Sequence, residues 1–156
     1  MPVVSAEADV DAHLDPWCLV PLETGESILF GYALHHAKTG GLAWLSSSEV
    51  LDLQEASGRG VTRSGRRYLL GRQFDAVDVG AEGEEARLAF ELLIGRDYQG
   101  ANALTEVDRL WLMARKAARH LGIEPPVRTD SATRAFFDRH AAGYFAVRRR
   151  GKGTMS

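Results

Sequence analysis

The sequence has little of what several classes of protein require. It has one cysteine, Cys18, among 156 residues, so no internal disulfide can form. No apolar run reaches the ~18 residues of a membrane span, and we expect no membrane contact. The N-terminus is acidic and lacks the basic start and apolar core of a signal peptide. Together these absences predict a cytoplasmic protein.

Motifs for metal, nucleotide or nucleophilic chemistry are also missing. The histidines show no CxxC or HExxH spacing, and no serine lies in a GxSxG turn. No glycine-rich loop opens a helix as phosphate loops do. We therefore expect no metal ion, no cofactor and no catalysis. One enzyme hypothesis stays open: a small hydrolase with a pocket lined by His35, His36 and a carboxylate such as Asp52.

Short apolar segments with tight turns dominate the first half of the chain. Residues 27–34 are apolar on both faces, as in a central strand that is covered from two sides. Ser46-Ser47-Ser48 interrupts an apolar run and indicates a bulge. A glycine-ended turn at 55–58 and a two-residue turn at Ser64-Gly65 separate the following strands. Five or six strands over about residues 17–74 predict a curled antiparallel sheet or a small barrel.

The apolar period changes from strand to helix in the second half. Three segments between residues 82 and 147 repeat apolar residues at three- and four-residue steps. Thr105 with Asp108 resembles a capping box at the start of the second segment. The sequence therefore predicts an α+β protein, in which the sheet is followed by three helices.

The length fits one domain. We expect a flexible acidic arm at residues 1–14, a single α+β domain at 15–147 (sheet 15–74, helices 82–147) and a basic tail at 148–156.

Charge is distributed unevenly, although the formal net charge is only −2. Residues 1–57 hold nine acids and one lysine, whereas residues 58–74 hold five arginines and no acid. Residues 101–156 hold eleven basic residues and five acids. Guanidinium groups suit bidentate contact with phosphate or carboxylate. The candidate binding residues are Arg59, Arg63, Arg66, Arg67, Arg72, Arg148, Arg149, Arg150 and Lys152.

Residues 62–72, TRSGRRYLLGR, preceded by Val50, Asp52 and Gly58, carry a recognisable pattern. They resemble a T-x-S-G-R-x-Y-x-L-G segment of small uncharacterised bacterial proteins. The resemblance covers about residues 28–72 and leaves the helices out. It implies a bacterial protein and brings no known activity.

The arginine block predicts a non-enzymatic accessory or regulatory protein that engages nucleic acid or a nucleic-acid-handling complex, for example an inhibitor such as an anti-CRISPR protein. A second hypothesis is an interaction module that recognises an acidic protein surface or associates with itself. A structural alternative also stays open, in which the arginines pair with the chain's own acids at residues 75–91 or near the N-terminus.

Overall fold

The structure, a computed structural model, describes residues 10–95 and 104–154, with side chains described up to residue 147. The chain divides into two compact units, residues 1–102 and 103–156, and each is presented by itself. The expectation of one domain over residues 15–147 stays a prediction.

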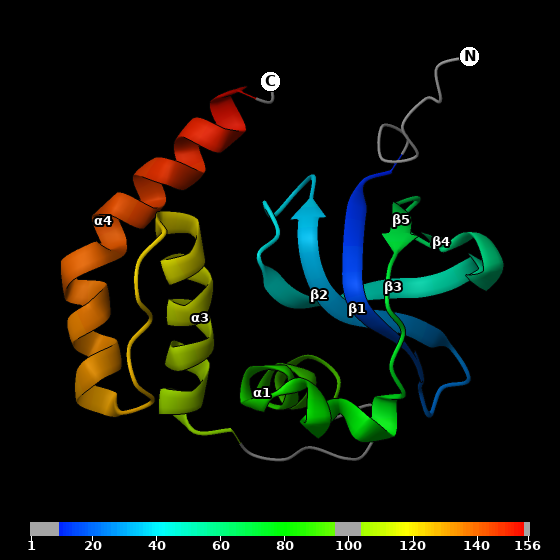
Figure 1. The fold of residues 1–156 in the computed structure, drawn as a ribbon, viewed down its shortest axis with the longest axis horizontal. Coiled ribbons are helices and arrows are strands. Elements are labelled where there is room, and N and C mark those ends of the chain that lie inside the picture. Colours follow the sequence, from blue (N-terminus) through cyan, green and yellow to red (C-terminus); the bar gives the residue numbers. More distant parts are fainter. Residues whose placement is uncertain (1–9, 96–103, 155–156) are drawn as a thin grey trace. The chain divides into compact units, whose positions relative to one another are not determined.

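The first unit contains a closed five-stranded barrel (Figure 1). Consecutive strands pair antiparallel, and β5 pairs with β1 in parallel to close the barrel. The small-barrel prediction is confirmed, but the sheet is mixed, because the fifth strand of an up-and-down run points the same way as the first. The strands are β1 (Ala12–Pro21), β2 (Ser27–His36), β3 (Ala43–Gln54), β4 (Arg59–Thr62) and β5 (Arg67–Leu70).

The first strand begins earlier than the sequence pattern indicates. Ala12 and Leu14 are fully buried and pair with β2 and β5, so residues 12–14 belong to the barrel and not to the predicted arm. The register of β1 shifts twice between His13 and Trp17, which broke the alternation that would have revealed the strand. Residues 1–9 lie outside the described part of the chain.

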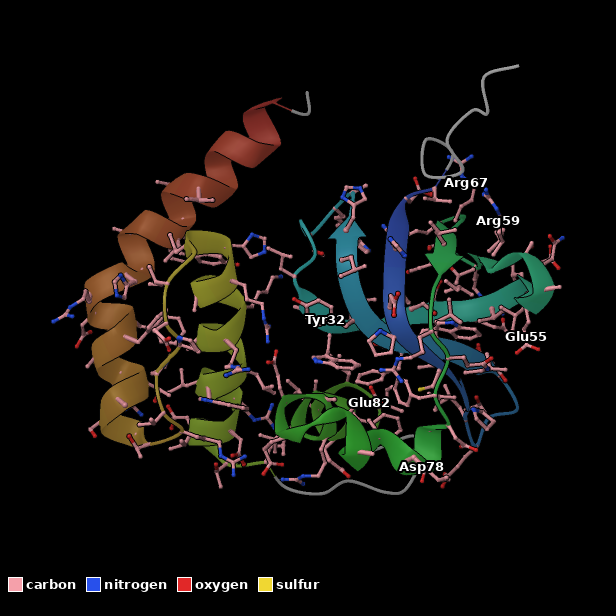
Figure 2. The ribbon with its side chains drawn as sticks, viewed as in Figure 1. Tyr32, Glu55, Arg59, Arg67, Asp78 and Glu82 are labelled. Atoms are coloured by element: carbon pink, nitrogen blue, oxygen red, sulfur yellow. The ribbon has the colours of Figure 1, made fainter. Side chains whose placement is uncertain are left out.

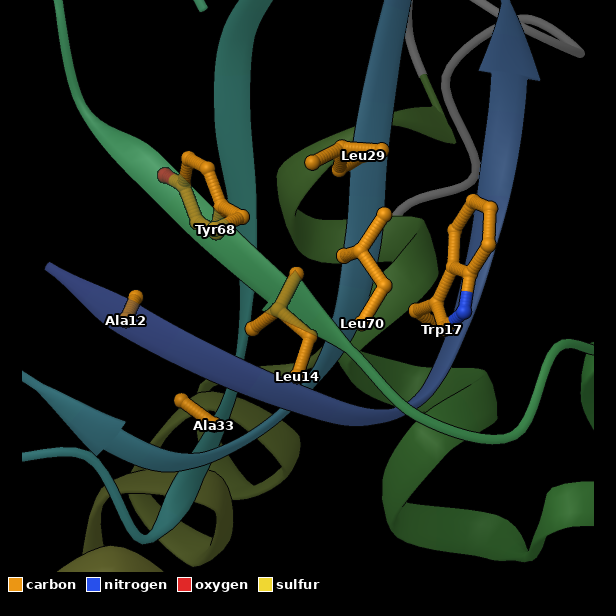
Figure 3. Close-up of a cluster of buried hydrophobic side chains, with 7 residues drawn as sticks. All are labelled: Ala12, Leu14, Trp17, Leu29, Ala33, Tyr68 and Leu70. Carbon is orange, nitrogen blue, oxygen red and sulfur yellow. The ribbon is translucent and has the colours of Figure 1, made fainter. Parts of the chain in front are cut away.

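The barrel interior is filled by apolar side chains from β1, β2 and β5 (Figure 3). The indole Nε1 of Trp17 donates to the carbonyl of Gly71 at 3.0 Å, so this buried polar group is satisfied. A Cβ on Gly31 would lie 2.6 Å from the carbonyl oxygen of Pro16, because β1 and β2 approach closely there. The cluster consists of Ala12, Leu14, Trp17, Leu29, Ala33, Tyr68 and Leu70.

The serine run in β3 forms the predicted bulge. Ile28 pairs with Glu49 and Phe30 with Ser46, so two residues of β3 oppose one residue of β2. The hydroxyl of Ser47 accepts the Leu29 N–H at 2.9 Å and replaces the missing ladder bond.

Helical segments cover part of the outer barrel surface. A 3-10 segment, η3 (Ala76–Glu82), leads into α1 (Glu84–Leu93). The ring of Phe90 in α1 packs edge-on against the ring of Phe30, with 5.2 Å between the ring centroids. Phe30 faces outward while Leu29 faces the interior, and both are fully buried. This confirms that β2 is covered on both faces. A shorter 3-10 turn, η2 (Glu55–Ser57), joins β3 to β4.

The second unit is a pair of helices, α3 (Glu106–Leu121) and α4 (Asp130–Thr154). Both run in the same direction, and residues 122–129 return along them (Figure 1). An ion pair of 3.0 Å joins Arg134 near the start of α4 to Glu106 at the start of α3. The Trp111 indole donates to the carbonyl of Pro126 at 3.2 Å and holds the return segment.

The α+β class is confirmed, but four helical elements follow β5 in the residues described, η3, α1, α3 and α4, instead of three. The additional element, η3, is a 3-10 segment whose exposed, non-periodic residues gave no helical signal. The backbone of α4 continues to Thr154, so residues 148–154 of the predicted tail are helical. No helix within the described ranges is long and apolar enough to cross a membrane.

Candidate binding surfaces

The hairpin arginines lie beside carboxylates that come from other parts of the barrel unit. Arg63 pairs with Glu49 of β3 and lies 4.0 Å from Glu26. The Arg67 Nε is 3.6 Å from the carboxylate of Asp11. All the partners come from outside the hairpin, so folding brings them to it.

Arg72 and Arg66 are also engaged. Arg72 pairs with Glu82 of η3, and this hydrogen bond raises the pKa of the Arg72 guanidinium. Arg66 forms a hydrogen bond with the Tyr68 hydroxyl. Burial raises the pKa of Tyr68, and the hydrogen bond from Arg66 offsets only part of that rise. Three of the five arginines, Arg63, Arg67 and Arg72, therefore pair with carboxylates from different segments of the chain.

These ion pairs are exposed and individually weak. The side chains of Arg63, Arg67 and Arg72 are each more than half exposed. Exposed pairs of this kind contribute about 0–1 kcal/mol to stability. The arginines thus remain in contact with water, but each has a carboxylate that a ligand would have to displace.

Arg59 of β4 and Arg67 of β5 lie near each other (Figure 2), and both line one depression beside these strands. Its volume is about 130 Å³, and Asp52, Gln54 and Tyr68 also line it. Asp52 therefore contributes a carboxylate to the same depression as the two guanidinium groups.

The residues of the hydrolase hypothesis do not come together. His36 is buried, and its Nδ1 accepts N–H bonds from Lys38 and Thr39 at 3.1 Å each, so it holds the loop after β2. His35 points to the exposed side. Asp52 lines the arginine depression, which neither histidine lines.

Cys18 is buried and has no nucleophilic environment. Burial raises the pKa of its thiol to about 12, and the nearby carboxylates of Asp75 and Glu82 add to the effect. The thiol is therefore protonated at neutral pH. In the described ranges, no group of three or more His, Cys, Asp or Glu residues could hold a metal ion.

The helical unit carries an apolar groove that the sequence pattern did not identify as a site. The groove lies between α3 and α4 and has a volume of about 230 Å³. Met113 and Phe145 are 60% and 57% exposed. Its lining residues are Met113, Lys116, Phe137, Ala141, Tyr144 and Phe145.

The signal for this groove is a second apolar stripe on α4. Phe136 is buried against alanines of α3, while Phe137, Ala141 and Phe145 follow one another at four-residue steps beside it. The α3 cluster also takes up part of Phe137, but Phe145 at the far end of the second stripe stays 57% exposed. The second stripe borders the groove.

The predicted site residues of the C-terminal end cannot be placed as side chains. Arg148, Arg149, Arg150 and Lys152 lie on the backbone of α4, but their side chains are outside the described part of the structure.

Comparison with family models, with curated proteins and with solved structures finds no match to this chain.

Proposed function

We propose that the protein is a non-enzymatic binding protein whose helical unit recognises an acidic surface of a partner protein. The observation that carries the proposal is the division of charge between the two units. Residues 10–95 hold thirteen acidic and seven basic residues, a net of −6. Residues 104–156 hold five acidic and eleven basic residues, a net of +6. A long-range field of this kind attracts an acidic partner to the helices.

The barrel is the weaker candidate surface. Its net charge repels a polyanion, and at least three of its hairpin arginines already pair with carboxylates. An incoming phosphate or carboxylate would replace an existing contact and so gain little.

The helical unit has cations that its own acids do not neutralise. Arg134 already engages both Glu106 and Asp130. Among the described residues, Arg109 and Arg139 are exposed and form no ion pair. The excess positive charge of this unit is therefore open to a partner.

Nucleic acid is the second candidate partner. The same excess of positive charge supports it, because Arg148, Arg149, Arg150 and Lys152 extend the basic sequence of α4. The helical unit, and not the arginine hairpin, would then contact the phosphates. The bacterial origin and the cytoplasmic location stay predictions.

The test compares two labelled probes, an acidic polypeptide and a single-stranded DNA, by fluorescence anisotropy with the full chain. We expect the polypeptide to bind at ~50 mM salt and to dissociate as salt rises, because exposed charges are screened. The variant Arg109→Ala with Arg139→Ala should weaken binding several-fold. Failure of the polypeptide to bind contradicts the proposal. A DNA dissociation constant below ~10⁻⁶ M at physiological salt, tighter than non-specific binding, would assign the surface to nucleic acid.

A further inference from the structure

The groove between α3 and α4 offers more than charge. Four of its lining residues, Met113, Phe137, Tyr144 and Phe145, present large apolar or aromatic side chains. Single exposed apolar residues are ordinary on a protein surface, but a contiguous set along one groove marks an interaction site. Ala141 is the small residue among them, and it leaves room for a side chain from outside.

We propose that this groove holds the apolar face of an amphipathic helix from a partner protein, with acidic residues beside that face. The inference rests on the proposed function and names the element that is recognised. Helix-in-groove recognition uses apolar anchors at positions i, i+3 or i+4, and i+7. Two helices that lie side by side provide an elongated groove that suits such a row of anchors.

The charges around the groove predict on which side of it the partner's carboxylates lie. Lys116 lines the groove, and Arg109 lies on the same face of α3, four residues before Met113 and seven before Lys116. On the other wall, Asp138 follows Phe137 and is exposed. The partner's carboxylates should therefore lie on the α3 side, where the cations are.

The combination of features favours protein over nucleic acid. A phosphate backbone gains from Arg109 and Lys116 but gains nothing from Met113, whereas an amphipathic helix uses all three. The aromatic rings of Tyr144 and Phe145 could stack on unpaired bases, so single-stranded DNA is included in the test.

The experiment measures binding of a labelled peptide to the full chain by fluorescence anisotropy. The peptide is a designed helix with leucines at i, i+4 and i+7 flanked by glutamates, and its control is a scrambled peptide of the same composition. We expect the designed peptide to bind at least about tenfold more tightly than the scrambled one. Only the designed peptide places its leucines on one face.

Variants of exposed groove residues locate the contact without disturbing the core. Met113→Ser with Phe145→Ser should weaken binding of the designed peptide about tenfold or more. Val127→Ser is the matched control, because Val127 is 69% exposed and does not line the groove. Lys116→Ala should weaken binding at low salt but not at high salt, and Asp138→Ala should strengthen it.

The outcomes separate this inference from the proposed function. The two peptides could bind equally well, with binding weakened by Arg109→Ala with Arg139→Ala but not by Met113→Ser with Phe145→Ser. That result would overturn the groove as the binding site and would leave the proposed acidic partner standing. Absence of binding by either peptide would overturn both. Displacement of the peptide by single-stranded DNA, or self-association of the chain that Phe145→Ser abolishes, would assign the groove to another occupant and also overturn the inference.

Discussion

Cys18 illustrates how burial sets the behaviour of a single residue. Its thiol has an ordinary pKa of 9.0, which the folded protein raises to about 12, mainly by desolvation. Between these two values the unfolded chain has lost a proton that the folded chain keeps. The free energy of unfolding contributed by this group is therefore fully present below pH 9 and falls as the pH rises toward 12.

This predicts that stability decreases above pH 9 and that Cys18→Ala makes the decrease shallower. The measurement is urea unfolding of both proteins between pH 7 and about 10.5, comparing the slopes and not the absolute values, since the alanine also leaves a small cavity. Tyr68, whose pKa is also raised, titrates in both proteins and does not affect the comparison. Parallel pH profiles would contradict the assignment.

Gly31 is a second position where one residue decides the packing. Gly31→Ala places a Cβ 2.6 Å from the Pro16 carbonyl oxygen, so the backbone of β1 or β2 must shift. We expect a loss of about 1–3 kcal/mol in the free energy of unfolding, as for other overpacked sites. Gly80→Ala is the control, because a Cβ there meets nothing within 4 Å. Equal effects of the two substitutions in a denaturant titration would show that the close contact relaxes without cost.

At the scale of elements, the start of α3 depends on a reciprocal cap. The Thr105 hydroxyl accepts the Asp108 N–H at 3.1 Å, and the Asp108 carboxylate accepts the Thr105 N–H at 3.2 Å. Thr105→Ala should cost about 1 kcal/mol, and Thr105→Ser, which keeps the hydroxyl, should cost less. Thermal unfolding followed by circular dichroism measures both variants. A serine variant as unstable as the alanine variant would rule out the cap as the cause.

The elements that could be predicted from sequence are those specified by local chemistry. The turn ending at Gly58, the bulge at Ser47 and the cap at Thr105 each follow from residue types within a few positions, and the structure contains all of them. The start of β1 at Ala12 could not be predicted, because two register shifts interrupt its pattern. The groove was also missed, since two apolar stripes on α4 do not tell which of them a neighbour covers.

At the scale of the whole molecule, charge blocks are visible in the sequence but their partners are not. Arg63 and Glu49 are 14 residues apart and meet where β3 pairs with β4, whereas Arg67 and Asp11 are 56 apart and meet only because β5 closes the barrel against β1. The arginine block predicts a cationic surface if it is considered alone. Pairing of Arg63, Arg67 and Arg72 with carboxylates of other segments neutralises part of that block. The excess of positive charge lies in residues 104–156.

The central claim is that the binding surface lies on the helices and not on the arginine hairpin. The most direct measurement is the affinity of the designed acidic peptide for two double variants that each lose two positive charges. Arg109→Ala with Lys116→Ala should weaken binding about tenfold at ~50 mM salt, equivalent to ~1.4 kcal/mol. Arg63→Ala with Arg67→Ala should leave the affinity unchanged within about twofold, because those arginines already form ion pairs with Glu49 and Asp11. The opposite pattern, loss of affinity in the hairpin variant alone, would contradict the account.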